Sequence, residues 1–120
     1  MKVMVVDDNR DSAISLSMVV EMLGHEVRTA FDGEEALVVA GAFHPALVLL
    51  DLGMPRMDGY EACRRMRLQP WGIAMTVVAV TAWGHAEARR KTGLAGFDGH
   101  FVKPVAPDLI ARTLNEMAPA

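Results

Sequence analysis

The sequence predicts an α/β domain in which a parallel β-sheet is covered by helices on both faces. Short apolar runs alternate five times with longer amphipathic stretches. The central runs, Ala46–Leu50 and Thr76–Val80, are almost continuously apolar. Strands of that kind must be covered on both faces, as they are when right-handed crossover helices connect parallel strands. No linker, repeat or low-complexity tract interrupts the pattern, so we expect one domain over residues 1–120.

The five expected strands are short and rich in β-branched and other apolar residues. The second strand is the least apolar, which favours a position near an edge of the sheet. In chain order they are Val3–Val6, His25–Thr29, Ala46–Leu50, Thr76–Val80 and Gly99–Val102.

Each strand is followed by a helical stretch with recognisable end signals. Asp32 and Asp58 are suited to cap helix N-termini, and Gly24 is suited to end the first helix. In that first helix, Ala13, Leu16, Val20 and Leu23 should form the buried face; in the last, Ile110, Leu114 and Met117 should point inward. The expected helices run from Asn9 to Leu23, from Asp32 to Gly41, from Asp58 to about Leu68, from Trp83 to about Gly93, and onward from Pro107.

The composition excludes several classes of protein. Hydrophobic residues make up 52% of the 120 residues and charged residues 22%, as expected for a folded domain rather than a disordered one. The net charge of −3 argues against direct nucleic-acid binding. Cys63 is the single cysteine, which excludes an internal disulfide and a cysteine-rich metal site. No apolar stretch is long enough to span a membrane, and Asp7 and Asp8 come too early for a signal peptide. We therefore expect a cytoplasmic protein without membrane contact, and the sequence leaves open whether it is a monomer or a weak dimer.

Polar residues stand at the carboxyl ends of the expected strands. Asp7 and Asp8 follow the first strand, Asp51 the third, Thr81 the fourth and Lys103 the fifth. In an open α/β sheet, ligands bind beyond the carboxyl ends of the strands, where the strand order reverses. If the order is 2-1-3-4-5, the three aspartates converge there and Thr81 and Lys103 flank Asp51.

Three carboxylates close together either hold protons or bind a cation. An all-oxygen site favours Mg²⁺, with Mn²⁺ as an alternative, and Asp8, Asp51 and a backbone carbonyl near Gly53 could supply the ligands. Lys103 and the Thr81 hydroxyl could then bind a second anion. This set suits phosphoryl transfer onto Asp51, with the metal and Lys103 neutralising charge on the phosphoryl oxygens. No Gly-rich phosphate loop is present, which argues against a nucleotide-binding domain.

The chain resembles the receiver domains of two-component response regulators over essentially its whole length. The resemblance rests on four stretches in order: Val5-Val6-Asp7-Asp8-Asn9, Leu50-Asp51-Leu52-Gly53-Met54-Pro55-Arg56-Met57-Asp58-Gly59, Val80-Thr81-Ala82 and Phe101-Val102-Lys103-Pro104. It implies a flavodoxin-like (βα)5 fold similar to chemotaxis regulators. It also implies that Asp51 is the phospho-acceptor and that a sensor histidine kinase or a histidine phosphotransfer protein is the donor.

The same resemblance implies roles for the other site residues. Asp8 and Asp51 would hold Mg²⁺ and Asp7 would act on it through water, while Lys103 and Thr81 would contact the phosphoryl group. Phosphorylation would then change the surface around the fourth helix, the fifth strand and the fifth helix. The Lys103–Pro104 bond would be cis. Such a domain is not an enzyme with a separate substrate: it catalyses only its own phosphorylation and dephosphorylation.

Three residues depart from common family patterns. His100 stands where many receivers have a Tyr or Phe switch residue, and its polarity and capacity for protonation put the usual switch in doubt. Gly53 and Trp83 occupy positions that resemble tuning sites for phosphoryl lifetime, and neither can hold an attacking water through a carboxylate or amide. We therefore expect slow autodephosphorylation. The tract "FDGHFVKPV" is similar to receivers fused to the C-terminus of hybrid sensor kinases.

Two rival functions fit the same fold. One is a phosphorylation-independent binding module, whose usual mark is the loss of an acidic residue or the lysine; none is lost here. The other is a Mg²⁺-dependent phosphatase that uses an aspartyl-phosphate. That chemistry commonly needs a second aspartate two residues after the nucleophile, and Gly53 occupies that position.

Overall fold

A five-stranded parallel sheet forms the centre of the protein, in the order β2-β1-β3-β4-β5. The computed structural model describes residues 1–82 and 86–117. The predicted topology is confirmed, including the edge position of β2. The strands are β1 (Lys2–Val6), β2 (Glu26–Ala30), β3 (Leu47–Asp51), β4 (Thr76–Thr81) and β5 (Gly99–Val102).

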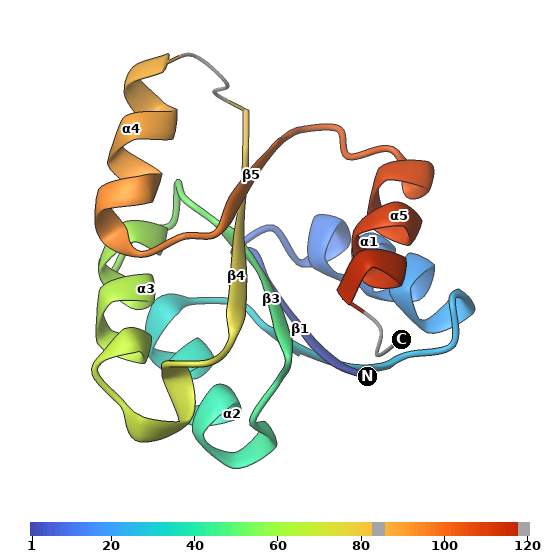
Figure 1. Ribbon diagram of the computed structural model, residues 1–120, viewed down its shortest axis with the longest axis horizontal. Coiled ribbons are helices and arrows are strands. Elements are labelled where there is room, and N and C mark those ends of the chain that lie inside the picture. The colour runs from blue at the N-terminus through green and yellow to red at the C-terminus, as the bar shows by residue number, and fades with distance from the viewer. Residues whose placement is uncertain (83–85, 118–120) are drawn as a thin grey trace.

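Helices cover both faces of this sheet (Figure 1). α1 and α5 lie on one face, and α2, α3 and α4 lie on the other. The helices are α1 (Arg10–Met22), α2 (Gly33–Phe43), α3 (Gly59–Arg67), α4 (Ala86–Ala95) and α5 (Pro107–Met117), with a short 3₁₀ helix η1 (Pro70–Gly72) between α3 and β4.

Alternate residues of each strand pack into two core layers, one on each face of the sheet, because successive side chains of a strand point to opposite faces. In β3, Leu47 and Leu49 pack toward α1 and α5, whereas Val48 and Leu50 pack toward α2 and α3. All five residues of β3 are buried. Asp51 is thus the polar end of a strand that is enclosed on both faces.

The predicted helix caps are confirmed by hydrogen bonds. The Asp32 carboxylate accepts from the Glu35 N–H at 2.7 Å, and the Asp58 carboxylate accepts from the Glu61 N–H at 2.9 Å. Gly24 follows α1 with a φ of +93°, a conformation that glycine adopts without strain.

Two expectations about helix details are wrong. α2 does not end at Gly41 but continues to Phe43, and His44 takes the left-handed cap conformation with φ 50°. Leu23 is not on the buried face of α1: it is the C-cap and is 41% exposed. Ser17 takes the buried position instead, because its hydroxyl donates to the Ala13 carbonyl within the helix at 2.7 Å and so needs no outside partner.

The remaining helices agree with the sequence to within a few residues. α4 is described from Ala86 and ends at Ala95, two residues beyond the predicted Gly93. Trp83, the expected start of that helix, lies outside the described residues. Ile110 and Leu114 of α5 are buried, and Met117 packs beside them. In the described parts of the chain, no helix has the length and apolar character needed to cross a membrane.

Candidate functional site

Three carboxylates converge at the carboxyl ends of β1 and β3. Asp7 and Asp8 follow β1, and Asp51 ends β3, which is paired directly with β1. One carboxylate oxygen from each of the three lies within 4.8 Å of the others. Asp7 and Asp51 are buried, with exposed fractions of 6% and 8%, while Asp8 is exposed. The strand order thus brings together the three aspartates that the sequence singled out.

Lys103 lies among these carboxylates. Its Nζ donates to Asp7 Oδ2 at 3.0 Å and lies 3.7 Å from Asp51 Oδ2. The sequence placed Lys103 beside Asp51 alone, but the closer partner is Asp7. The pair joins residues 96 positions apart in the chain, so sequence spacing gives no sign of it. The bond that follows, Lys103–Pro104, is cis as expected.

Backbone groups orient the two buried carboxylates. Asp7 Oδ1 accepts from the Asn9 N–H at 2.9 Å, and Asn9 in turn caps α1 by accepting from the Ser12 N–H at 3.0 Å. Asp51 Oδ1 accepts from the Gly53 N–H at 3.3 Å. Gly59 has no room for a side chain, because a Cβ there would overlap the backbone carbonyl of Asp51. The loop after β3 is therefore packed tightly against Asp51.

The electrostatics of the cluster are only partly balanced. Burial raises the pKa of the Asp51 carboxyl above its ordinary value, and the charge of Asp7 raises it further, while Lys103 opposes both effects. Burial alone would lower the pKa of Lys103, but its hydrogen bond to Asp7 and its attraction to Asp51 outweigh this and raise it. One lysine therefore faces more negative charge than it can neutralise, which favours a further cation at the site.

An all-oxygen set of this kind fits a hard divalent ion such as Mg²⁺. Both oxygens of Asp7 already accept hydrogen bonds, from Asn9 and from Lys103. Asp8 is exposed, and the bond that Asp51 Oδ1 accepts from the Gly53 N–H is long, so these two carboxylates are better placed to bind an ion directly. The donor set thus fits the predicted ion.

Thr81 ends β4 next to the cluster and is 1% exposed. Its carbonyl accepts from the Lys103 N–H at 2.7 Å, which joins the ends of β4 and β5 beside Asp51. His100 lies on β5, half-buried, with Nδ1 3.5 Å from the Thr92 hydroxyl of α4. The predicted switch residues therefore connect the site to α4 through β5. Trp83, the second predicted tuning position, is outside the described residues.

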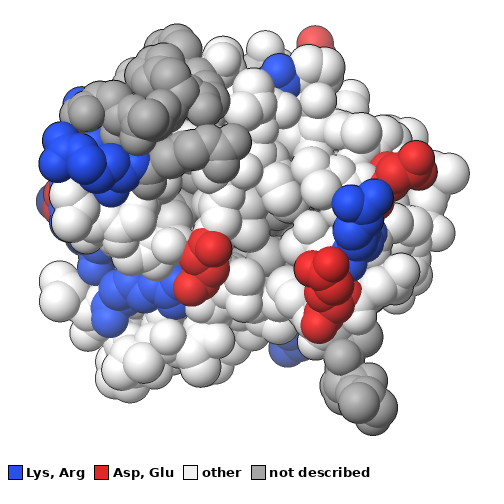
Figure 2. Space-filling view, turned by 45° about the horizontal axis from the view of Figure 1, so that its top comes forward, with Lys and Arg blue, Asp and Glu red and all other residues white. Residues whose placement is uncertain are grey.

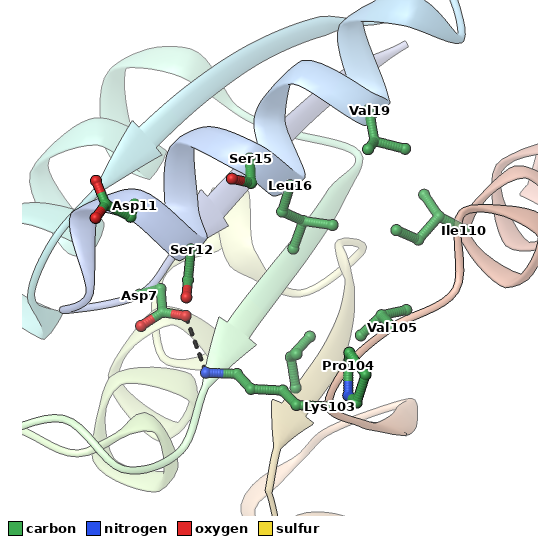
Figure 3. Close-up of a pocket in the computed structure, with 11 residues that line it drawn as sticks. Asp7, Asp11, Ser12, Ser15, Leu16, Val19, Lys103, Pro104, Val105 and Ile110 are labelled. Atoms are coloured by element: carbon green, nitrogen blue, oxygen red, sulfur yellow. Dashed lines mark hydrogen bonds and ion pairs between the residues drawn. The ribbon is translucent and has the colours of Figure 1, made fainter.

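A cleft of about 590 Å³ adjoins the site between α1 and α5 (Figure 3). The ion pair of Asp7 and Lys103 lies at one end, and Leu16, Val19 and Ile110 line the other. The sequence did not predict this cleft, because its walls come from segments far apart in the chain. It offers apolar surface directly beside the charged cluster.

The face of the molecule shown in Figure 2 carries few charged side chains among its described residues. On the face in Figure 2, the Lys, Arg, Asp and Glu side chains stand in separate groups within a largely uncharged surface. The described residues of this face form no broad basic field, in agreement with the net charge of −3.

Comparison with known proteins identifies the family. Residues 3–115 match the model of the response regulator receiver domain. Among curated proteins, the chain is 42% identical over 107 residues to the probable transcriptional regulator ycf27 of Cyanophora paradoxa and 38% identical over 115 residues to the sensor histidine kinase RcsC of Escherichia coli K12. The alignments cover 88% and 96% of this chain, but only 43% of ycf27 and 12% of RcsC.

Solved structures agree in fold. The chemotaxis protein CheY4 of Vibrio cholerae has a TM-score of 0.92 at 30% sequence identity, with 98% of each chain covered. The receiver domain of DrrB in a BeF₃-activated form has a TM-score of 0.83 at 30% identity, with 96% of this chain and 94% of that chain covered. The chain therefore belongs to the response regulator receiver family and is a receiver domain of two-component signalling.

Proposed function

We propose that this receiver is a phosphorylation switch in which Asp51 accepts a phosphoryl group from a phosphohistidine. The observation that carries the proposal is the convergence of Asp7, Asp8 and Asp51 around the ammonium group of Lys103. Such a site combines a carboxylate nucleophile with groups that neutralise the charge of a phosphoryl group. The similarity to DrrB, whose receiver has been obtained in a BeF₃-activated form, supports the same chemistry.

Each residue of the site has a separate role in the proposed phosphoryl transfer. An Asp51 oxygen attacks phosphorus, the donor imidazole leaves, and Lys103 draws one phosphoryl oxygen through its positive charge. Asp8, Asp51 and the Gly53 carbonyl would hold Mg²⁺, with Asp7 acting through water; Mg²⁺ supplies charge neutralisation at the phosphoryl oxygens. Thr81 would donate its hydroxyl to the phosphoryl group. Apart from its own phosphorylation and dephosphorylation, we expect no catalysis.

The donor is expected to be a sensor histidine kinase or a histidine phosphotransfer protein. The match to a region of RcsC, a sensor histidine kinase, supports this class of partner. The cleft beside Asp7 and Lys103 gives such a donor apolar surface to contact next to the acceptor. Phosphorylation would then bias two conformations of the α4–β5–α5 surface, because Thr81 and Lys103 adjoin β4 and β5.

A phosphotransfer assay tests the donor class. A histidine phosphotransfer protein labelled with ³²P on histidine is mixed with the wild-type chain, with Asp51→Asn and with Asp108→Asn, an exposed carboxylate on α5 that serves as a matched control. We expect label to move from the donor to the wild type and to Asp108→Asn in the presence of Mg²⁺, and not to Asp51→Asn. Equal labelling of Asp51→Asn would contradict the assignment of the acceptor.

A further inference from the structure

Arg67 joins several segments near the amino ends of β4 and β5, at the end of the sheet opposite the acidic cluster. It is the last residue of α3, its side chain is only 20% exposed, and all five of its N–H donors meet acceptors. Nη1 donates to the Met75 carbonyl at 2.6 Å and the Gly72 carbonyl at 2.9 Å, just before β4. Nε and Nη2 donate to the Gly96 carbonyl at 3.0 and 2.9 Å, directly after α4. Arg67 thus binds the end of α4 to the start of β4.

Asp98, just before β5, adds a carboxylate to these contacts. We call Arg67, Asp98 and the carbonyls that Arg67 binds the anchor. Its Oδ2 accepts from Arg67 Nη2 at 2.7 Å and from the Val77 N–H at 2.9 Å, and its own N–H donates to the Val77 carbonyl at 2.7 Å. Between Gly96 and Asp98, the Phe97 ring is buried and meets Tyr60 of α3 edge-on. The junction of α4 and β5, residues 96–98, is therefore held by charge, hydrogen bonds and apolar packing.

Gly93 lies in α4, three residues before this junction. A Cβ at this position would meet nothing within 4 Å, and its φ lies outside the left-handed region. Neither close packing nor backbone conformation therefore requires glycine here. Glycine within a helix lowers helix stability because it leaves the unfolded backbone more freedom. α4 thus has a weak point immediately before its anchored end.

The opposite ends of β4 and β5 are tied to the acidic cluster instead. Thr81 ends β4, and Lys103 follows β5, where Val102 is 41% exposed. These ends are joined by the bond from the Lys103 N–H to the Thr81 carbonyl. A change at Asp51 would therefore act on β4 and β5 at the ends farthest from Arg67.

We propose that Arg67 is a positioning residue that holds residues 96–98 fixed while Gly93 lets the rest of α4 bend against them. Phosphorylation of Asp51 then displaces α4 and β5 progressively, from almost nothing at Gly96 to the largest shift at the site. The inference rests on the proposed switch. It adds where the moving surface pivots and which residues set the pivot.

Amide hydrogen exchange, with and without phosphorylation by acetyl phosphate and Mg²⁺, tests the pivot. The N–H groups of Gly96, Phe97 and Asp98 all donate to backbone carbonyls, so their exchange reports the junction directly. In the wild type, we expect phosphorylation to change exchange in residues 99–102 while exchange in residues 96–98 stays within about twofold. A change in residues 96–98 as large as that in 99–102 would contradict the pivot.

Two variants at Arg67 separate the anchor from general stability. In Arg67→Gln, and to a lesser degree in Arg67→Lys, exchange of residues 96–98 should rise about tenfold without phosphorylation and should respond to phosphorylation. The matched control is Arg64→Gln, because among the described residues the Arg64 guanidinium donates to Glu61 on the same exposed face of α3 and makes no bond to residues 96–98. Equal exchange of residues 96–98 in Arg67→Gln and Arg64→Gln would overturn the proposal.

Gly93→Ala tests whether Gly93 lets α4 bend. The variant should fold well, because the added methyl group meets open space. Stiffening α4 should reduce the phosphorylation-induced change in exchange of α4 by about half or more. An unchanged response would contradict the role of Gly93. If Asp51 takes up no phosphoryl group, the proposed function fails and the pivot with it; if Asp51 is phosphorylated and residues 96–98 behave as in the control, only the pivot fails.

Discussion

Charged groups lie beside both ends of β4. The acidic cluster, formed by Asp7, Asp8, Asp51 and Lys103, lies at the carboxyl ends of the strands (the carboxyl edge). Arg67, Asp98 and the carbonyls that Arg67 binds, here called the Arg67 cluster, lie at the amino ends of β4 and β5 (the amino edge). In the Arg67 cluster, all five donors of one guanidinium meet carbonyls and a single carboxylate, Asp98. In the acidic cluster, one ammonium group faces Asp7 and Asp51, with Asp8 close by, and the pKa of Asp51 is raised.

The difference indicates which end of the sheet is built to change. Matched hydrogen bonds make a structure rigid, because every alternative leaves a buried polar group unpaired. Unbalanced charge can instead be relieved by a bound cation or by a reaction that alters a carboxylate. We therefore expect mutations at the Arg67 cluster to lower stability under all conditions. Mutations at the acidic cluster should alter the chemistry and should change stability in a way that depends on Mg²⁺ or pH.

The largest expected loss of stability follows from removing the guanidinium. Arg67→Met keeps most of the stem but leaves the carbonyls of Gly72, Met75 and Gly96 without their donor. The free energy of unfolding should fall by about 3 kcal/mol, a value kept low because the Asp98 side chain is half exposed. Urea unfolding measures it, with Arg64→Met as the control. A loss no larger than in the control would show that the anchor is not stabilising.

Removing the cation of the acidic cluster should have a smaller and conditional effect. Lys103→Gln leaves Asp7 and Asp51 without their ammonium partner, so stability at pH 7 should fall by about 2 kcal/mol. Because Mg²⁺ can replace the missing positive charge, millimolar Mg²⁺ should restore part of the loss. Thermal unfolding with and without Mg²⁺ checks this, beside Lys91→Gln at an exposed position on α4. A loss that Mg²⁺ leaves untouched would argue against a metal site here.

The lifetime of the phosphoryl group should depend on residue 53. Gly53 has no side chain to position an attacking water, so the wild-type aspartyl-phosphate should persist for minutes or longer. Gly53→Asn supplies an amide beside Asp51 and should speed hydrolysis about tenfold, or 1.4 kcal/mol of barrier. Decay of the phosphorylated protein is followed by mass spectrometry. A half-life of seconds that Gly53→Asn does not shorten would contradict the expectation.

The smallest expected effect is a gain of stability in Asp51→Asn. Burial and the charge of Asp7 raise the folded-state pKa of Asp51 above its ordinary value, so ionisation of this carboxyl destabilises the fold. The penalty is absent at pH values below the ordinary pKa of an aspartate, grows as the pH rises from there to the folded pKa, and is complete above the folded pKa.

Asp51→Asn should therefore raise the melting temperature at pH 7 by about 4 °C, or about 1 kcal/mol, and lose this advantage at low pH. Asp11→Asn, an exposed carboxylate in the first turn of α1, should instead be neutral or slightly destabilising. A lower melting temperature for Asp51→Asn at pH 7 would show that its attraction to Lys103 outweighs burial and repulsion.

The carboxyl edge of the sheet was largely predictable from the sequence. Apolar runs fix the strands, and parallel strands bring their carboxyl ends to one edge, so Asp7, Asp51 and Lys103 could be placed together. The partner of Lys103 could not be assigned in this way, because the flexible stem can reach either Asp7 or Asp51. The cleft between α1 and α5 depends on packing distances that no local pattern encodes.

The contacts of Arg67 at the amino ends of β4 and β5 were not predictable in the same way. Arg64, Arg65 and Arg67 form one basic run, and such a run on a helix is typical of a solvated face. The structure supports that for Arg64 and Arg65, which bind Glu61 on the exposed side of α3. Arg67 instead lies four residues after Cys63, on the side of α3 that turns toward the core. Helical spacing could have signalled its burial, but its acceptors are main-chain carbonyls, which a sequence does not reveal.

The most direct test of the proposed switch is the intact mass of the protein after incubation with acetyl phosphate, with and without Mg²⁺. We predict one added, base-labile phosphoryl group on the wild type that requires Mg²⁺, and none on Asp51→Asn. Addition of the group without Mg²⁺, or to Asp51→Asn, would contradict the assigned site. If the wild type binds Mg²⁺ but takes up no phosphoryl group, either from acetyl phosphate or from a histidine-phosphorylated donor, the protein is a phosphorylation-independent binding module.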